Sequence, residues 1–304
     1  MSSFDISNLG SHPAFASQKQ VVPLAGFSGA AIALLRTADG ARFVRKAAGE
    51  PGGNKVVKEQ ADRQIWLRKV LEGAAEVPKI LETGEIEGLY YFDMEFVPSA
   101  DVNIFLRSAP FDEIKRFSSR IEGLMIHMAS QHDQNATPPS GHAFIEKLDQ
   151  IEHRTSGRFD HLLLPLREGF EKVKPLLSAM PATVTHGDLT FENILVDPDG
   201  KLWLIDPIQS PIDHFWMDWS KLFQECEGRW YKHRGKHLSA GITHWLRNRW
   251  LSAATEISPD YPALHHLLLA LTFARILPYA RSETDVNFVA ERVEAFGNAS
   301  LGGR

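Results

Sequence analysis

Three polar residues near the middle of the chain have the types and the spacing that phosphoryl transfer requires. Asp188 is followed five positions later by Asn193, and a second carboxylate, Asp206, comes after a short hydrophobic stretch. Transfer of a phosphoryl group from a magnesium nucleotide needs one group that orients the acceptor hydroxyl and takes its proton, together with oxygen ligands for the metal. We therefore expect Asp188 to receive the proton and Asn193 and Asp206 to ligate one or two Mg²⁺ ions.

The stretch between these groups predicts a β-hairpin. Residues 194–196 form an apolar strand, residues 197–200 have the composition of a turn, and residues 202–205 form a returning strand. Because the two carboxylates flank this hairpin, we expect both of them at strand ends that face one cleft.

The same residues resemble a known family of enzymes. His186-Gly187-Asp188 followed by Asn193 matches the H-G-D-x-x-x-x-N catalytic loop of the aminoglycoside phosphotransferase and choline kinase superfamily, whereas protein kinases usually carry H-R-D at this place. With Asp206 at the family spacing, the resemblance implies a kinase that transfers the γ-phosphoryl group of ATP or GTP directly to a hydroxyl, with Mg²⁺ as the metal. It also implies that His186 fixes the loop by hydrogen bonds.

The resemblance implies a two-lobed, protein-kinase-like fold of the α+β class. The small N-terminal lobe, residues 1–97 and ordered from about residue 20, would carry an antiparallel sheet plus one helix and would bind the nucleotide. The larger, mostly helical C-terminal lobe, residues 98–304, would carry the catalytic loop and bind the acceptor.

The predicted metal-binding turn departs from the family pattern. Protein kinases have D-F-G and the superfamily commonly D-x-G, whereas this chain has Asp206-Pro207-Ile208. Proline fixes its own φ, so we expect a stiffer turn than the usual one. The departure leaves Asp206 available as a ligand, but it keeps open the alternative of a pseudokinase that binds nucleotide without turnover.

The N-terminal lobe is predicted from three strand-like segments between residues 21 and 47, with a glycine-bearing turn after the first. In that turn Gly26 and Gly29 let backbone N–H groups approach phosphate oxygens, and Ser28 adds a hydroxyl donor. We expect this turn to cover the phosphates of the nucleotide.

Lys46 ends the third segment, in an F-V-R-K run that resembles the V-A-I-K element of kinases. The resemblance implies that Lys46 holds the α- and β-phosphates. In a helix predicted over about residues 54–72, Glu59 is the implied partner of Lys46, and Asp62, three residues on and on the same face, is the alternative. Strand alternation places Lys46 on the buried side and Arg45 toward solvent.

The strand predicted over residues 90–96 ends where kinase-like folds have the hinge between their lobes. The resemblance implies that Glu95, Phe96 and Val97 bind the adenine base through backbone groups. It also implies that Met94 lines the base pocket.

Composition and charge restrict the other possibilities. A chain of 304 residues is long enough for two lobes or one large domain. The net charge of −5 and the pI near 6.2 give no global basic field, so nucleic acid is not an expected partner. The single cysteine, Cys226, excludes an internal disulfide and fits a reducing cytoplasm. Because we find neither a secretory signal nor an uninterrupted apolar span, we expect a cytoplasmic protein without a membrane partner; the oligomeric state is left open.

The C-terminal lobe is predicted to be helical, with an amphipathic stretch over residues 111–132 and further helices up to residue 296. The run at residues 217–222 resembles the D-L-A-x-L that opens the helix after the metal turn in the family. Asp218 is therefore implied to brace the backbone of the catalytic loop, and a helix N-cap is an equally good interpretation.

The residues after that helix favour a neutral or anionic acceptor. Basic and aromatic side chains are frequent from Arg229 to Trp250, and the carboxylates are mainly Glu225 and Glu227. Aminoglycosides are polycations, for which a kinase should offer carboxylates. We therefore expect a sugar, sugar phosphate or glycan-related metabolite stacked on indole faces, although the same residues also suit solvated helix faces around core tryptophans. A protein Ser/Thr kinase is disfavoured because no A-P-E follows the metal turn.

Overall fold

The computed structural model describes residues 9, 11–16, 21–24, 29–131, 140–210, 212 and 214–302. The chain forms two compact units: unit 1 comprises residues 1–99 and 197–209, and unit 2 comprises residues 100–196 and 210–304. The predicted boundary after residue 97 assigned residues 197–209 to the C-terminal lobe, whereas their contacts put them in unit 1.

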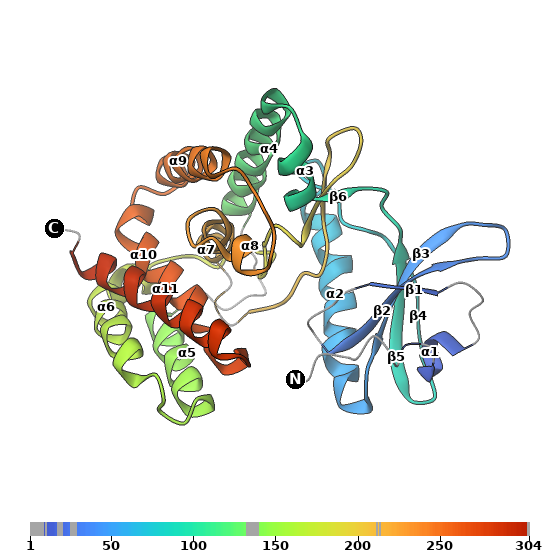
Figure 1. The fold of residues 1–304 in the computed structure, drawn as a ribbon, viewed down its shortest axis with the longest axis horizontal. Coiled ribbons are helices and arrows are strands. Elements are labelled where there is room, and N and C mark those ends of the chain that lie inside the picture. Colours follow the sequence, from blue (N-terminus) through green and yellow to red (C-terminus); the bar gives the residue numbers. More distant parts are fainter. Residues whose placement is uncertain are drawn as a thin grey trace. The chain divides into compact units, whose positions relative to one another are not determined.

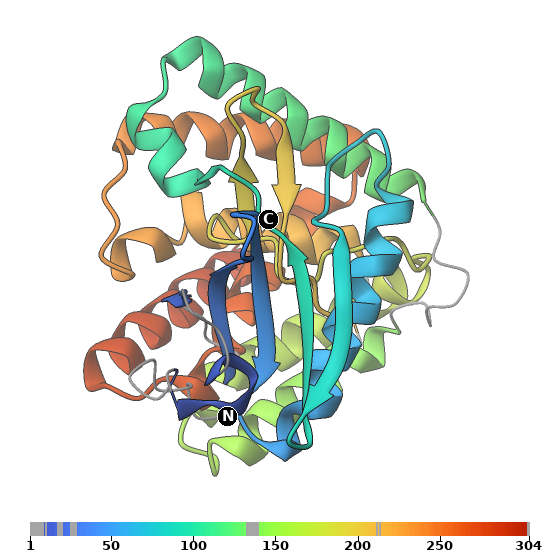
Figure 2. The same ribbon diagram turned by 90° about the vertical axis from the view of Figure 1, so that its right-hand side faces the viewer.

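Unit 1 is built on a five-stranded antiparallel sheet in the order β1-β2-β3-β5-β4 (Figure 1, Figure 2). The strands are β1 (Val21–Pro23), β2 (Ala30–Arg36), β3 (Arg42–Ala48), β4 (Ile80–Ile86) and β5 (Leu89–Glu95). Helix α2 (Asn54–Val70) packs on β3 and β5. The remaining short elements are α1 (Pro13–Ala16) and the 3₁₀ turn η2 (Pro51–Gly53).

Both faces of β3 are covered. Val44 packs in a cluster with Val57 of α2, and Ala47 packs on the opposite face in a cluster with Phe15 of α1. Because side chains alternate along a strand, Lys46 points to the same side as Val44, and it is fully buried. The alternation therefore puts the ammonium in the interior of unit 1.

The prediction that Arg45 faces solvent is wrong, because the segment around α1 covers its side of the sheet. Its guanidinium donates to both carboxylate oxygens of Asp93, at 2.7 and 2.8 Å, and to the carbonyl oxygen of Ala14 at 2.9 Å. The guanidinium also lies 4.1 Å from the centroid of the Tyr91 ring. This two-point pairing neutralises a buried charge whose partners the local sequence does not reveal.

The segment that carries Asp206 is tied to unit 1 by short backbone contacts. Its strand β8 (Leu202–Leu204) follows a turn in which the Gly200 N–H donates to the Asp197 carbonyl at 2.8 Å. Glu76 donates its N–H to Leu202 and accepts one from Leu204, at 2.8 and 2.9 Å. These bonds hold the end of β8, and with it Asp206, against unit 1.

Unit 2 is mostly helical (Figure 1). Its central helix is α10 (Tyr261–Ala274), whose residues 267–274 are all buried because the helix packs against α6, α7, α9 and α11. A short antiparallel pair joins β6 (Ala100–Asp101) to β7 (Ile194–Val196). The other elements are α3 (Val102–Ser108), α4 (Phe111–Ser130), α5 (Gly141–Arg154), α6 (Asp160–Ser178), α7 (Phe215–Cys226), α8 (Trp230–His233), α9 (Ala240–Ile257), η3 (Leu277–Tyr279) and α11 (Glu283–Gly302).

The predicted α+β class, with one sheet and one main helix in the smaller part and helices in the larger, is confirmed. In the part of the chain that the structure describes, every helix is too short or too polar to span a bilayer. The cytoplasmic location stays a prediction.

Candidate active site

Asp188 belongs to the loop of residues 186–193, which we call the catalytic loop, and both oxygens of its carboxylate are contacted. Lys221 Nζ lies 3.0 Å from Oδ1, and Asn193 Nδ2 donates to Oδ2 at 3.0 Å. The same amide nitrogen donates to the Asp188 carbonyl at 2.9 Å. One third of the Asp188 side chain, 33%, remains exposed, so the oriented carboxylate is still accessible to a hydroxyl.

The pKa of the Asp188 carboxyl lies below its ordinary value of 3.8. Burial by itself would raise this pKa, but the charge of Lys221 and its hydrogen bond outweigh burial, with His186 and Arg275 adding to the effect. The carboxylate is therefore ionised at neutral pH. If such a weak base took part in phosphoryl transfer, it would contribute mainly by orienting the hydroxyl and would receive the proton late in the reaction.

Asp218, at the start of α7, braces the backbone of the catalytic loop. Its two oxygens accept the N–H groups of His186 at 2.7 Å and of Gly187 at 3.0 Å, and its side chain is fully buried. Gly187 has φ of 85°, a conformation that residues with a Cβ rarely adopt. His186 Nδ1 accepts the N–H of Asp188 at 3.3 Å. The predicted bracing role of Asp218 and the structural role of His186 agree with these bonds.

The oxygen donors of Asn193 and Asp206 suit Mg²⁺ in chemical kind. The amide nitrogen of Asn193 is used within the catalytic loop, so the oxygen Oδ1 is the atom it can offer to a cation. Asp206 offers a carboxylate whose side chain is 30% exposed. Amide and carboxylate oxygens are the protein ligands that Mg²⁺ prefers.

In unit 1 the buried ammonium of Lys46 pairs with Asp206. Nζ and Oδ1 are 2.8 Å apart, although the two residues are 160 positions apart in sequence. Asp206 has φ of 57°, in the left-handed region, and Pro207 after it is buried. The turn that replaces D-x-G therefore presents the carboxylate to Lys46.

The structure does not bring Glu59 or Asp62 to Lys46. Glu59 is 60% exposed on the outer side of α2 and lies 3.8 Å from Lys55, one helical turn away, and Asp62 is also exposed. The sheet side of α2 instead carries Gln60, whose Oε1 is buried and has no hydrogen-bond partner among the described residues. The expected pair is wrong because Glu59 and Asp62 lie on the exposed side of α2, whereas Lys46 is buried and pairs with Asp206.

Most of the residues predicted to bind the nucleotide lie in the described part of unit 1. Met94 is buried at the end of β5, and Glu95 Oε2 accepts the Lys79 N–H at 3.0 Å. Phe96 lies under the guanidinium of Arg42, 4.4 Å from the ring centroid, and Val97 follows it. Gly29 has φ of 73°, whereas Gly26 and Ser28 lie outside the described residues.

The sequence motifs did not predict that Lys221 and Arg275 act on Asp188. The H-G-D-x-x-x-x-N pattern contains no basic position, and Arg275 directly follows α10, far along the chain. Helical spacing is the signal that could have found Lys221, because it lies three residues after Asp218 and so on the same face of α7.

The first of the two carboxyl groups at the end of α7 is buried within unit 2. Glu225 is only 2% exposed, and burial, with the nearby charge of Glu192, raises its pKa to about 8. Its Oε2 has no hydrogen-bond partner among the described residues. At neutral pH Glu225 is therefore a buried, mostly uncharged group.

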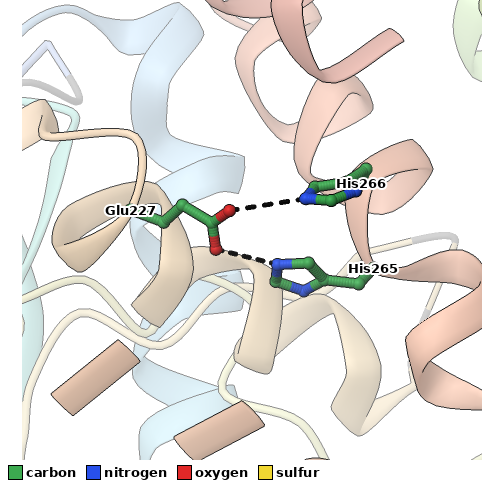
Figure 3. Close-up of side chains that lie close together, drawn as sticks. All are labelled: Glu227, His265 and His266. Atoms are coloured by element: carbon green, nitrogen blue, oxygen red, sulfur yellow. Dashed lines mark hydrogen bonds and ion pairs between the residues drawn. The ribbon is translucent and has the colours of Figure 1, made fainter. Parts of the chain in front are cut away.

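Glu227 lies at the centre of a charged cluster with His265 and His266 (Figure 3). The histidine Nε2 atoms lie 2.9 and 3.4 Å from its two oxygens, and Arg247 contacts the same oxygens through Nε at 3.1 Å and Nη2 at 3.4 Å. Burial opposes the charge on Glu227, but these partners bring its pKa well below the ordinary range. Glu227, His265 and His266 are close enough to share a metal ion, yet the guanidinium already neutralises the carboxylate.

The chain is similar to known phosphotransferases in sequence pattern and in fold. Residues 21–256 match the model of the phosphotransferase enzyme family, and no curated protein sequence matches the chain. The fold is similar to the GDP and kanamycin complex of an APH(2″) enzyme, with a TM-score of 0.65 at 14% identity over 98% of each chain. A Thermobifida fusca protein assigned as a fructosamine-3-kinase gives 0.63 at 15% identity, over 97% of this chain and 98% of the other.

A macrolide 2′-phosphotransferase type I is similar over 100% of each chain, with a TM-score of 0.60 at 12% identity. At these identities the likeness concerns the fold. It confirms the predicted two-lobed kinase-like architecture.

Proposed function

We propose that the acceptor of this chain, which belongs to the phosphotransferase enzyme family and is a small-molecule kinase, is a neutral or anionic hydroxyl compound. The acceptor class that fits best is a sugar or a glycan-related metabolite rather than an aminoglycoside. The observation that carries the proposal is Asp188, an ionised carboxylate with cations rather than carboxylates around it.

In the proposed reaction the acceptor oxygen attacks the γ-phosphorus of ATP or GTP while Asp188 orients the hydroxyl. A new bond forms between that oxygen and the γ-phosphorus, the bond to the β–γ bridging oxygen breaks, and the hydroxyl proton passes to Asp188. The nucleoside diphosphate leaves with the bridging oxygen. Positioning and charge neutralisation supply most of the rate in this chemistry.

We assign the nucleotide and metal roles to residues that each unit supplies. Asn193 and Asp206 would hold Mg²⁺, which neutralises charge on the β- and γ-phosphates when it is bound. Lys46 would hold the α- and β-phosphates, and its 2.8 Å pair with Asp206 keeps the buried ammonium compensated while the nucleotide is absent. The other proposed nucleotide contacts are Gly26, Ser28 and Gly29 for the phosphates and Met94, Glu95, Phe96 and Val97 for the base.

The charged groups of unit 2 support a neutral or anionic acceptor. A polycation would need exposed carboxylates, but Glu225 is buried with a pKa of about 8, and the charge of Glu227 is paired with Arg247. Its two oxygens also contact His265 and His266 (Figure 3). The cations Lys221 and Arg275 act on Asp188 itself. A protonated amine beside the reacting hydroxyl would therefore be repelled.

A matched set of acceptors tests the proposal. Glucose, glucuronic acid and glucosamine share one ring and are neutral, anionic and cationic at neutral pH. An aminoglycoside such as kanamycin adds a polycation to the cationic compounds. We expect release of ADP or GDP to rise with the neutral or anionic compounds, within a wider panel of sugars and sugar phosphates, and to stay at background with the cationic ones. Preference for the cationic compounds would overturn the proposed acceptor class.

The variant Asp188→Ala tests the site itself. It should lower acceptor-dependent turnover by about a thousandfold, since it removes the group that orients the hydroxyl, while thermal unfolding stays near that of the wild type. An unchanged rate would exclude Asp188 as the proton acceptor. Nucleotide binding without turnover over the whole panel would instead favour the pseudokinase alternative that Asp206-Pro207-Ile208 raises.

A further inference from the structure

Three ionisable side chains of α7 lie on the face that the catalytic loop covers. Asp218, Lys221 and Glu225 occupy positions i, i+3 and i+7, which bring side chains to one stripe of a helix. All three contact the catalytic loop, at different points along it. Helix α7 therefore supports this loop over most of its length.

Two of the three contacts are made to the backbone. Asp218 accepts the N–H groups of His186 and Gly187 at 2.7 and 3.0 Å. The carboxyl of Glu225 accepts a hydrogen bond from the backbone of Phe191. These bonds set the path of the loop, but they do not set the orientation of the Asp188 side chain.

Lys221 makes the third contact, and it reaches the carboxylate itself. Its Nζ lies 3.0 Å from Asp188 Oδ1, and its side chain is 11% exposed. Asn193 holds the other oxygen, Oδ2, at 3.0 Å. With one donor on each oxygen, rotation of the carboxylate about its last side-chain bond would break a charge-assisted hydrogen bond.

Lys221 is the cation that directly contacts the Asp188 carboxylate among the described residues. His186 and Arg275 also act on the Asp188 charge, but His186 is used in the loop through Nδ1, which accepts the Asp188 N–H at 3.3 Å. Arg275 comes from the segment after α10 rather than from α7. The ammonium on the helix is therefore the group best placed to hold Oδ1.

We propose that Lys221 is a positioning residue for phosphoryl transfer, which fixes the Asp188 carboxylate in the orientation that receives the acceptor hydroxyl. The inference rests on the proposed role of Asp188 as the proton acceptor. It assigns to α7 a part in catalysis that the H-G-D-x-x-x-x-N motif does not contain. Small displacements of a reacting group cost about a hundredfold in rate, so loss of this contact should affect turnover more than binding.

The test compares Lys221→Met, which keeps the length of the side chain, with Lys221→Arg, which keeps the charge. Lys172→Met, at an exposed lysine of α6, is the matched control. We expect Lys221→Met to lower kcat by about 10- to 100-fold with KM for the nucleotide within twofold, and Lys221→Arg to recover a substantial part of kcat. A kcat within twofold of the wild type for Lys221→Met would overturn the proposal.

A double-mutant cycle with Asp188→Asn separates this inference from the proposed function. If Lys221 acts through Asp188, Lys221→Met should cause no further loss in the Asp188→Asn background. An equal loss in both backgrounds would contradict a positioning role. If Asp188→Asn retains full activity, the proposed function fails; if Asp188→Asn is inactive while Lys221→Met is normal, only the inference about Lys221 fails.

Hydrolysis of ATP without an acceptor, in which the phosphoryl group passes to water and ADP is released, is measured in the same variants. This assay does not depend on which acceptor is used. The expected order of rates is the same, because water takes the place of the hydroxyl beside Asp188. Should Lys221→Met not fold, the same comparison is made between Lys221→Arg and Lys221→Gln, with thermal unfolding as the check. Equal rates for these two variants at the wild-type level would overturn the proposal.

Discussion

Helix α2 lies next to the strand that carries the buried Lys46 of unit 1, and α7 lies next to the catalytic loop of unit 2. The two helices differ in the side chains that they direct inward. The outer side of α2 carries Glu59, whereas the side that faces the sheet offers Gln60 to the interior. By contrast, α7 directs Asp218, Lys221 and Glu225 at the catalytic loop. A charged residue at family spacing therefore takes part in a site only if the rotation of its helix turns it inward.

The largest expected effect comes from Asp218 of α7. Asp218→Ala removes the acceptor of two buried N–H groups, each of which costs about 1 to 3 kcal/mol when it is left unsatisfied. We expect the free energy of unfolding to fall by roughly 3 kcal/mol and turnover to fall by about a thousandfold. Denaturant unfolding and nucleoside diphosphate release measure the two effects, with Ser108→Ala at the exposed end of α3 as control.

A smaller effect, dependent on pH, is expected at Glu225. The folded carboxyl keeps its proton up to about pH 8, whereas the unfolded one has the ordinary pKa of 4.5. The folded state therefore binds more protons than the unfolded state between these values, and stability falls as pH rises through this window. Between pH 6 and pH 8 this group should lower the unfolding free energy by about 2 kcal/mol.

Glu225→Gln should remove this pH dependence, since an amide does not ionise. Urea unfolding of the variant and the wild type at pH 6, 7 and 8 gives the comparison. Parallel stability curves for the two proteins would show that Glu225 is already ionised in the folded state at pH 6.

The smallest effect is expected at Glu59 of α2. Glu59→Gln should leave kcat and KM for the nucleotide within about twofold, because an exposed carboxylate beside Lys55 contributes little. Lys46→Met is the positive control, for which we expect kcat/KM to fall by about a hundredfold. A comparable loss in Glu59→Gln would mean that α2 turns inward when the nucleotide binds, and it would remove the contrast with α7.

Much of unit 1 could be predicted because its signals are local. Alternating apolar residues marked the strands around Lys46, and Asp197 to Gly200 marked the turn before β8. The burial of Arg45 could not be predicted in this way, since its partners Asp93 and Ala14 come from other segments. Covering of both faces of a strand is a property of the assembled unit rather than of the strand.

The sequence by itself determined the family of this protein and its proposed catalytic groups, because the order and spacing of Asp188, Asn193 and Asp206 are set by a short loop and hairpin. Only the tertiary structure decided what surrounds these groups. Lys46 meets Asp206 from 160 positions away, and Lys221 reaches Asp188 from a helix beyond the hairpin. Such pairs depend on helix rotation and on contacts between distant segments, to which the spacing within a motif is insensitive.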